Sequence, residues 1–84
     1  MNYTVSWEPD ALNDLAAIWL QAANRQAITV AQDQVDRLLA ADPHGNGIPV
    51  SEGLYAIEVD PLRAQFELSD ANRTVRVVSV GWLI

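Results

Sequence analysis

The sequence contains no cysteine and no lysine. Without cysteine, disulfide bonds and thiolate metal sites are excluded, and a reducing compartment suits the chain. No stretch approaches the roughly 20 consecutive apolar residues that cross a bilayer. Residues 1–9 also lack the basic segment and apolar run of a signal peptide. We therefore expect a cytoplasmic protein with no membrane partner.

Positive charge is scarce in this chain. Five arginines stand against eleven acidic residues, which gives a formal net charge of −6 at pH 7. Nucleic-acid affinity comes largely from cationic side chains that displace counterions from phosphates. The overall field of the chain therefore opposes the approach of RNA or DNA. This balance predicts good solubility and disfavours nucleic acid as a partner.

The first half of the chain predicts a strand and two helices. Residues 2–7 alternate in polarity, as a half-buried strand does. Pro9 suits the first turn of a helix, and Asn24 suits the cap of a second one. Both helices carry an apolar stripe, which predicts a helical hairpin with Trp7 and Trp19 in the core. The stripes consist of Leu12, Leu15, Ala16, Trp19, Ala22 and Ala23, and of Ile28, Ala31, Val35, Leu38 and Leu39.

The second half predicts a loop and three strands. Residues 42–50 contain two prolines and two glycines and are expected to form a loop. Residues 54–59, 62–68 and 74–82 have strand character. Residues 1–84 are therefore expected to form one α+β domain of order βααβββ, with a helical hairpin on one face of a four-stranded, mainly antiparallel sheet.

The face of the sheet that the helices leave uncovered is predicted from the alternation of the strands. Arg63 is expected beside Glu58, and Arg76 beside Glu67, because cross-strand neighbours lie about 4.5–5.5 Å apart at Cβ. A solvated salt-bridge face is the simplest interpretation. An apolar strip beside the arginines suits a protein partner. The predicted partner-binding residues are Arg63, Gln65, Arg76, Val78, Val80 and Trp82.

Few other residues suggest chemistry. His44 is the single histidine and lies in the glycine- and proline-rich loop, where a solvated side chain is the usual outcome. Asp33 and Asp36 are expected on the solvent face of the second helix. The sequence shows no phosphate-binding loop, zinc motif or nucleotide fingerprint. We expect neither a metal nor a cofactor.

The chain resembles the RelE/ParE superfamily of toxins, which includes plasmid stabilisation proteins. The resemblance rests on three segments: VSWEPDALNDLAAIW at residues 5–19, QVDRLLAADP at residues 34–43, and LRAQFELSDANRTVRVVSV at residues 62–80. It implies the same βααβββ order and the toxin role in a type II toxin–antitoxin pair. The family divides between ribosome-dependent messenger-RNA endonucleases and poisons of DNA gyrase.

The nuclease members carry basic residues that this chain largely lacks. Arg63 matches their third-strand arginine, but Gly81-Trp82-Leu83-Ile84 stands where a basic residue and often a terminal tyrosine or histidine are expected. Glu52 and Glu58 stand in place of the strand-two lysines. The resemblance therefore implies that ribonuclease chemistry is absent. Arg63, Arg73 and Arg76 are the weak catalytic candidates.

Three functional hypotheses follow. In the first, the chain is a toxin that is ParE-like or of undetermined target, with gyrase as one candidate, and a cognate antitoxin covers its open face and helices. In the second, it is an inert family member that serves as a protein-binding module. In the third, it is a messenger-RNA interferase that contacts phosphates through Arg63, Arg73 and Arg76. A homodimer fits the exposed apolar residues near Trp82.

Overall fold

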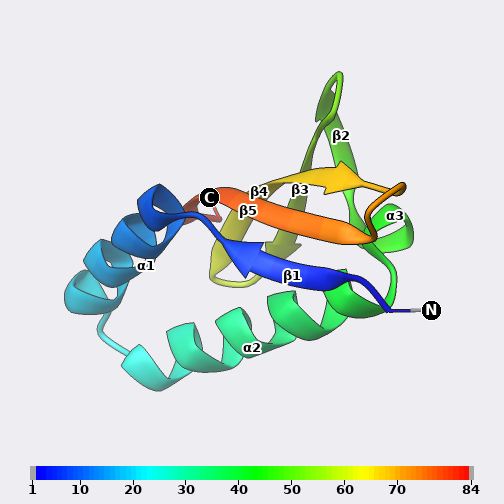
Figure 1. Cartoon of the computed structure of the whole chain (residues 1–84). Coiled ribbons are helices and arrows are strands. Elements are labelled where there is room, and N and C mark those ends of the chain that lie inside the picture. Colours follow the sequence, from blue (N-terminus) through cyan, green and yellow to red (C-terminus); the bar gives the residue numbers. More distant parts are fainter. Residues whose placement is uncertain (1, 84) are drawn as a thin grey trace.

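The computed structural model describes residues 2–83. Three helices and a five-stranded sheet make up the fold (Figure 1). The elements run in the order β1 (Thr4–Trp7), α1 (Pro9–Gln21), α2 (Arg25–Ala41), α3 (Pro43–Asn46), β2 (Ile48–Ser51), β3 (Leu54–Val59), β4 (Leu62–Ser69) and β5 (Thr74–Trp82). None of the helices within residues 2–83 is both long and apolar enough to span a bilayer.

The last strand lies inside the sheet. The strand order is β1-β5-β4-β3-β2, so β5 has a neighbour on each side. It runs parallel to β1, with Val5 opposite Val75, and antiparallel to β4, with Phe66 opposite Val77. The remaining pairs are antiparallel. The predicted α+β class and the mainly antiparallel sheet are confirmed.

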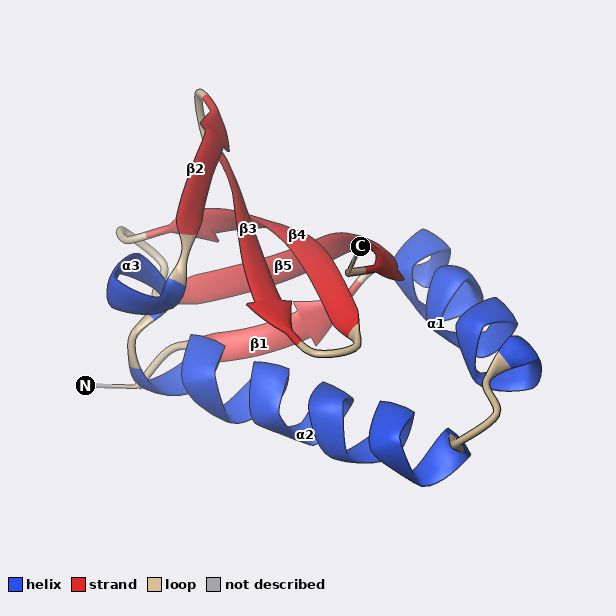
Figure 2. Cartoon of the chain, turned by 180° about the vertical axis from the view of Figure 1, so that it is seen from behind, coloured by secondary structure: helices blue, strands red, loops and turns tan. Residues whose placement is uncertain are grey.

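The two long helices begin where the sequence indicates. Pro9 occupies the first turn of α1, where the missing N–H costs no hydrogen bond. The Asn24 side chain caps α2 by accepting from the Ala27 backbone N–H at 3.1 Å. The helices share one side of the sheet, and α2 runs beneath it along β1 (Figure 2).

The core lies between the sheet and these helices. Phe66 is fully buried at its centre, on the face that the alternation of β4 predicts. Tyr55 stacks on the Phe66 ring at a centroid distance of 5.6 Å. The strands contribute Ile57, Leu62, Ala64, Phe66, Val75, Val77 and Val80, and the helices contribute Ala11, Leu15, Ile18, Ile28, Ala31, Val35 and Leu39.

The segment expected as a loop contains two short elements. The Asp42 carboxylate accepts from the Gly45 N–H at 2.9 Å and so begins the single turn α3. Residues Ile48–Ser51 then add β2 at the sheet edge, which makes five strands instead of four. Pro49 is tolerated there because an edge strand can leave one N–H position unused. The Gly53 backbone, at φ 75°, turns the chain from β2 into β3.

A β-bulge at Val78 reverses the facing of the end of β5. Phe66 pairs with Val77 and Gln65 pairs with Ser79, which leaves Val78 as an extra residue. After the bulge, Ser79 lies on the open face, whereas Val80 is 8% exposed and belongs to the core. Trp82 pairs with the buried Leu62 and shares its side of the sheet. The prediction that Val80 and Trp82 continue the open face was wrong.

The bulged segment is tied to α1. Beyond Val77, β5 no longer pairs with β1. The Asp14 carboxylate fills this position by accepting from the Val80 backbone N–H at 3.1 Å. This contact gives Asp14 a structural role that its place near the start of the helix did not indicate.

The tryptophans of the first half differ in burial. Trp7 packs against the core and donates from Nε1 to Asp36 at 2.7 Å. Trp19, which was expected in the core, is 41% exposed, and the Arg25 guanidinium lies 4.5 Å above its ring. The expectation was wrong for Trp19 because Ile18 takes the inward position in that turn of α1.

We expect Asp14→Ala to destabilise the fold. The variant leaves the Val80 N–H without its charged acceptor, which costs about 1.5–3 kcal/mol in the free energy of unfolding. Asp33→Ala is the matched control, because its ion pair with Arg37 on α2 (2.7 Å) is exposed and worth about 0.3–0.5 kcal/mol. Urea unfolding of both variants measures the difference, and equal losses would contradict the role assigned to Asp14.

Candidate functional site

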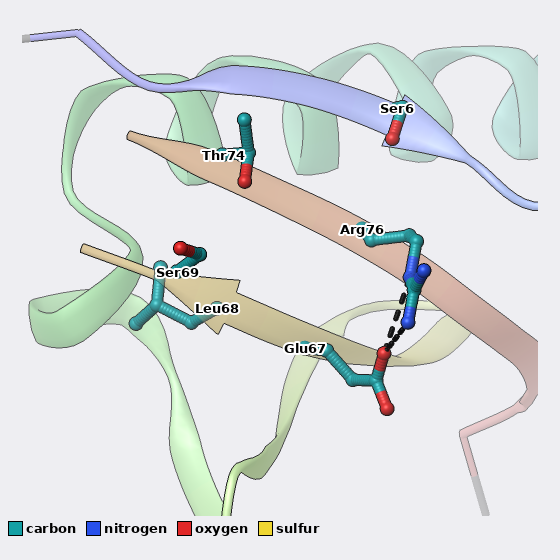
Figure 3. Close-up of a pocket in the computed structure, with 6 residues that line it drawn as sticks. All are labelled: Ser6, Glu67, Leu68, Ser69, Thr74 and Arg76. Carbon is teal, nitrogen blue, oxygen red and sulfur yellow. Dashed lines mark hydrogen bonds and ion pairs between the residues drawn. The ribbon is translucent and has the colours of Figure 1, made fainter. Parts of the chain in front are cut away.

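The uncovered face of the sheet carries a hollow of about 460 Å³. Side chains from β1, β4 and β5 line it, and Figure 3 shows them around the ion pair of Arg76 with Glu67. Its other lining residues are Ser6, Ser69 and Thr74, which carry hydroxyl groups, and Leu68. The hollow offers hydrogen bonds and a neutralised charge, which suit a polar protein segment.

Arg76 is held between two carboxylates. It pairs with Glu67, which lies directly opposite in the register, and its Nε also lies 3.2 Å from Glu8 Oε1. The hydrogen bond and charge of Glu67, followed by the charge of Glu8, raise the pKa of the Arg76 guanidinium above its ordinary value. The predicted pairing of Arg76 with Glu67 is present, and Glu8 adds a second acid that the strand pattern did not indicate.

Arg63 has the predicted partner as well. It lies opposite Glu58 across the β3–β4 pair and forms an ion pair with it. Its neighbour on the same face, Gln65, accepts a hydrogen bond from the Ser79 hydroxyl at 3.1 Å. Val78 lies away from both, at a hollow with Glu8, Pro9 and Asp10. Of the predicted apolar residues, Val80 and Trp82 line a hollow of about 210 Å³ with Arg63 and Gln65, whereas Val78 is separate from it.

The three candidate catalytic arginines do not converge. Arg63 lies at the register position of Gly81 and Arg76 at that of Glu67, four residues apart along β4, or roughly 13 Å. Arg73 lies in the β4–β5 turn with φ 54°, and its guanidinium is 5.2 Å from the centre of the Tyr3 ring. No single phosphate can contact all three in this arrangement.

A cluster of polar side chains at the β4–β5 turn is not predicted by any pattern in the sequence. The Asp70 carboxylate accepts from the Tyr3 hydroxyl at 2.8 Å and lies 2.7 Å from His44 Nε2. These hydrogen bonds, from His44 first and then Tyr3, lower the pKa of Asp70. The bond to Asp70 raises the pKa of Tyr3. His44 is thus bound to a carboxylate 26 residues away, a separation that no local motif reveals.

A second, apolar hollow of about 410 Å³ lies between α1 and α2. Its lining includes Leu12, Trp19 and Leu20, which are among the most exposed large apolar side chains in the structure. Over residues 2–83, no three acidic or histidine side chains gather as a metal site would require. The chain thus presents a polar sheet face and an apolar helix face.

The sequence matches a known protein family over most of its length. Residues 5–81 match the model of the ParE toxin of the type II toxin–antitoxin system parDE. The chain belongs to the ParE toxin family. No curated protein matches the sequence.

Solved structures share the ParE-family fold at low sequence identity. One chain of the Mycobacterium tuberculosis toxin–antitoxin complex RelBE2 is 19% identical with a TM-score of 0.83, over 99% of this chain and 100% of that one. The isolated E. coli RelE toxin is 19% identical with a TM-score of 0.67, over 98% and 85% of the two chains. The chromosomal ParDE system of P. aeruginosa gives 18% and 0.65, over 98% and 97%. The predicted RelE/ParE resemblance is confirmed.

We expect the Asp70 cluster to make the stability of this ParE-family chain depend on pH. The folded pKa of Asp70 is below its ordinary value of 3.8, so its stabilisation is present above the unfolded pKa and is lost as the pH falls through the folded one. Urea unfolding midpoints from about pH 6 to below pH 4 should fall less steeply for Asp70→Asn than for the natural chain.

The control for this measurement is Glu52→Gln, which removes an exposed carboxylate from the β2–β3 turn. It should retain the full pH dependence of the natural chain. Identical pH profiles for Asp70→Asn and the natural chain would show that the cluster does not stabilise the fold.

Proposed function

We propose that this chain is the toxin of a type II module that acts on its target through protein–protein contacts, with DNA gyrase as the target to test first. A cognate antitoxin neutralises it by covering the open sheet face and the helices. One observation carries the proposal: Arg63 and Arg76, the arginines of the open face, are each bound to a carboxylate.

The charge on this face argues against RNA chemistry. Glu8, Glu58 and Glu67 stand around two arginines, Arg63 and Arg76, so the group carries three negative and two positive charges. Cleavage of a phosphodiester by an adjacent 2′-hydroxyl needs cations at the developing negative charge and a positioned acid and base. A net negative group repels the phosphate that such a site must hold.

The exposed apolar surface supports a protein partner. Leu12 is 47% exposed and Leu20 is 67% exposed on α1, beside the hollow that separates α1 from α2. Contiguous apolar surface of this kind usually serves as a binding face. The structures of similar fold include the RelBE2 and RelBE toxin–antitoxin complexes. An antitoxin segment on these helices would bury the exposed leucines.

Two alternative functions use the same surfaces differently. An inert family member would use the same surfaces for binding without poisoning a target, since binding needs no free cations. A messenger-RNA interferase would require Arg63, Arg73 and Arg76 to contact phosphates from three separate places in the fold.

Exposed apolar side chains on α1 also suit a homodimer, which would compete with the antitoxin for that surface.

Expression of this chain in a bacterial host without its antitoxin is expected to arrest growth. Co-expression of the antitoxin should restore growth, because it covers the surface that contacts the target. A supercoiling assay with purified gyrase then tests the target directly. Soluble, folded protein that leaves growth unchanged would favour the inert binding module over the toxin.

Purified protein added to translating ribosomes is expected to leave messenger RNA intact. The matched variants are Arg63→Ala on the open face and Arg37→Ala on α2, each of which removes one ion-paired arginine. Primer extension on the messenger detects cleavage. Cleavage that Arg63→Ala abolishes and Arg37→Ala preserves would replace our proposal with the interferase.

A further inference from the structure

A further hollow of about 370 Å³ lies where the α1–α2 connection meets the β3–β4 turn and the end of β5. Figure 2 shows the β3–β4 turn above α2 and the end of β5 beside α1. It shares no lining residue with the sheet-face hollow or the α1–α2 hollow, and it shares Trp82 with the smaller hollow that Arg63 and Gln65 line. The lining residues are Ala22, Ala23, Asn24, Ala27, Ile28, Asp60, Pro61 and Trp82.

The walls of this hollow are largely apolar, and backbone contacts fix the position of Trp82. Ala22, Ala23 and Ala27 have short side chains, which leaves the space open above the buried Ile28. The Trp82 ring forms another wall and is 39% exposed. The Leu83 N–H donates to the Pro61 carbonyl at 2.8 Å, which fixes the end of β5 against the β3–β4 turn. This hydrogen bond and the pairing of Trp82 with Leu62 in the sheet together hold Trp82 at the hollow.

One charge at this hollow, the exposed Asp60 carboxylate, has no ion-pair partner among the described residues. Within the described residues, no side chain or backbone group donates to the Asp60 carboxylate. The Asn24 side chain is occupied as the α2 cap. Arg25, the next residue, donates from Nε to the Trp19 carbonyl at 3.1 Å and lies over the Trp19 ring. Arg63, the arginine nearest to Asp60 along the chain, forms its ion pair with Glu58.

We infer that this hollow receives a basic side chain, arginine or lysine, of the antitoxin; the inference rests on the proposed function for the partner's identity. The aliphatic stem lies along the alanines, the cation pairs with Asp60, and the Trp82 ring contacts the cation face-on. An arginine fits best, because its planar guanidinium both stacks on an aromatic ring and pairs with a carboxylate.

The charges of the whole chain explain why the partner supplies this cation. The chain carries −6, and each of its five arginines already has a partner within the fold: Arg25, Arg37, Arg63, Arg73 and Arg76. No arginine remains to neutralise Asp60 from within. Complementary charge across an interface gives specificity and fast association. An antitoxin with a basic residue at this point meets both the apolar walls and the carboxylate.

The first test uses the full chain and an acetylated tri-arginine peptide as the probe. Titration followed by NMR of the tryptophan indole N–H groups, with the Trp82 signal assigned from Trp82→Phe, should show a saturable shift of Trp82. Asp60→Asn should weaken this binding about ten-fold. Glu52→Gln, which removes an acid from another hairpin turn, should leave it unchanged. No saturable Trp82 shift, or equal effects of the two variants, overturns the site.

The second test concerns the occupant. The affinity of the antitoxin for the natural chain should be about ten-fold higher than for Asp60→Asn and unchanged for Glu52→Gln, as measured by calorimetry. If the arginine peptide binds at Trp82 while Asp60→Asn leaves antitoxin affinity intact, the antitoxin is not the occupant and the inference fails. Failure of growth arrest would instead refute the proposed toxin function, and the peptide titration would still decide the site.

Discussion

The register of β4 with both of its neighbours sets what the open face of this protein can do. It places Glu58 opposite Arg63 and Glu67 opposite Arg76. A slip of one residue would turn these side chains into the core and Phe66 out to solvent. Burial of Phe66, Ala64 and Leu62 on the other side of β4 therefore holds the ion pairs in place. Hydrophobic packing on one face of the sheet fixes the electrostatics of the other.

In this chain the fold of the family is retained, while the exposed residues set a surface chemistry of their own. At 17–20% identity to several RelE and ParE structures, the fold is retained because it depends on the pattern of apolar residues and not on their identity. The exposed positions are under no such constraint. In this chain they carry glutamates beside the arginines and apolar residues along α1, which suits contact with proteins. The function accordingly has to be argued from the surface.

The bulge at Val78 changes the side of the sheet that the following residues of β5 face. Without it, Val80 and Trp82 would face the same side of the sheet as Arg63 and Arg76, as simple alternation predicts. With it, Val80 completes the core, Asp14 holds its backbone N–H, and Trp82 closes the hollow next to Asp60. Trp82 therefore borders two hollows at the end of β5, one with Asp60 and a smaller one with Arg63 and Gln65.

Local features of the sequence are enough to predict the class of the fold, the helix starts at Pro9 and Asn24, the inward side of β4, and the pairing of Arg63 and Arg76 with glutamates. Each follows from local periodicity or from residues on neighbouring hairpin strands. The folded structure was needed to find the bulge, the fifth strand at the edge, the exposure of Trp19, and the Tyr3–Asp70–His44 cluster. These depend on contacts between residues far apart in the chain, whose distances no local pattern encodes.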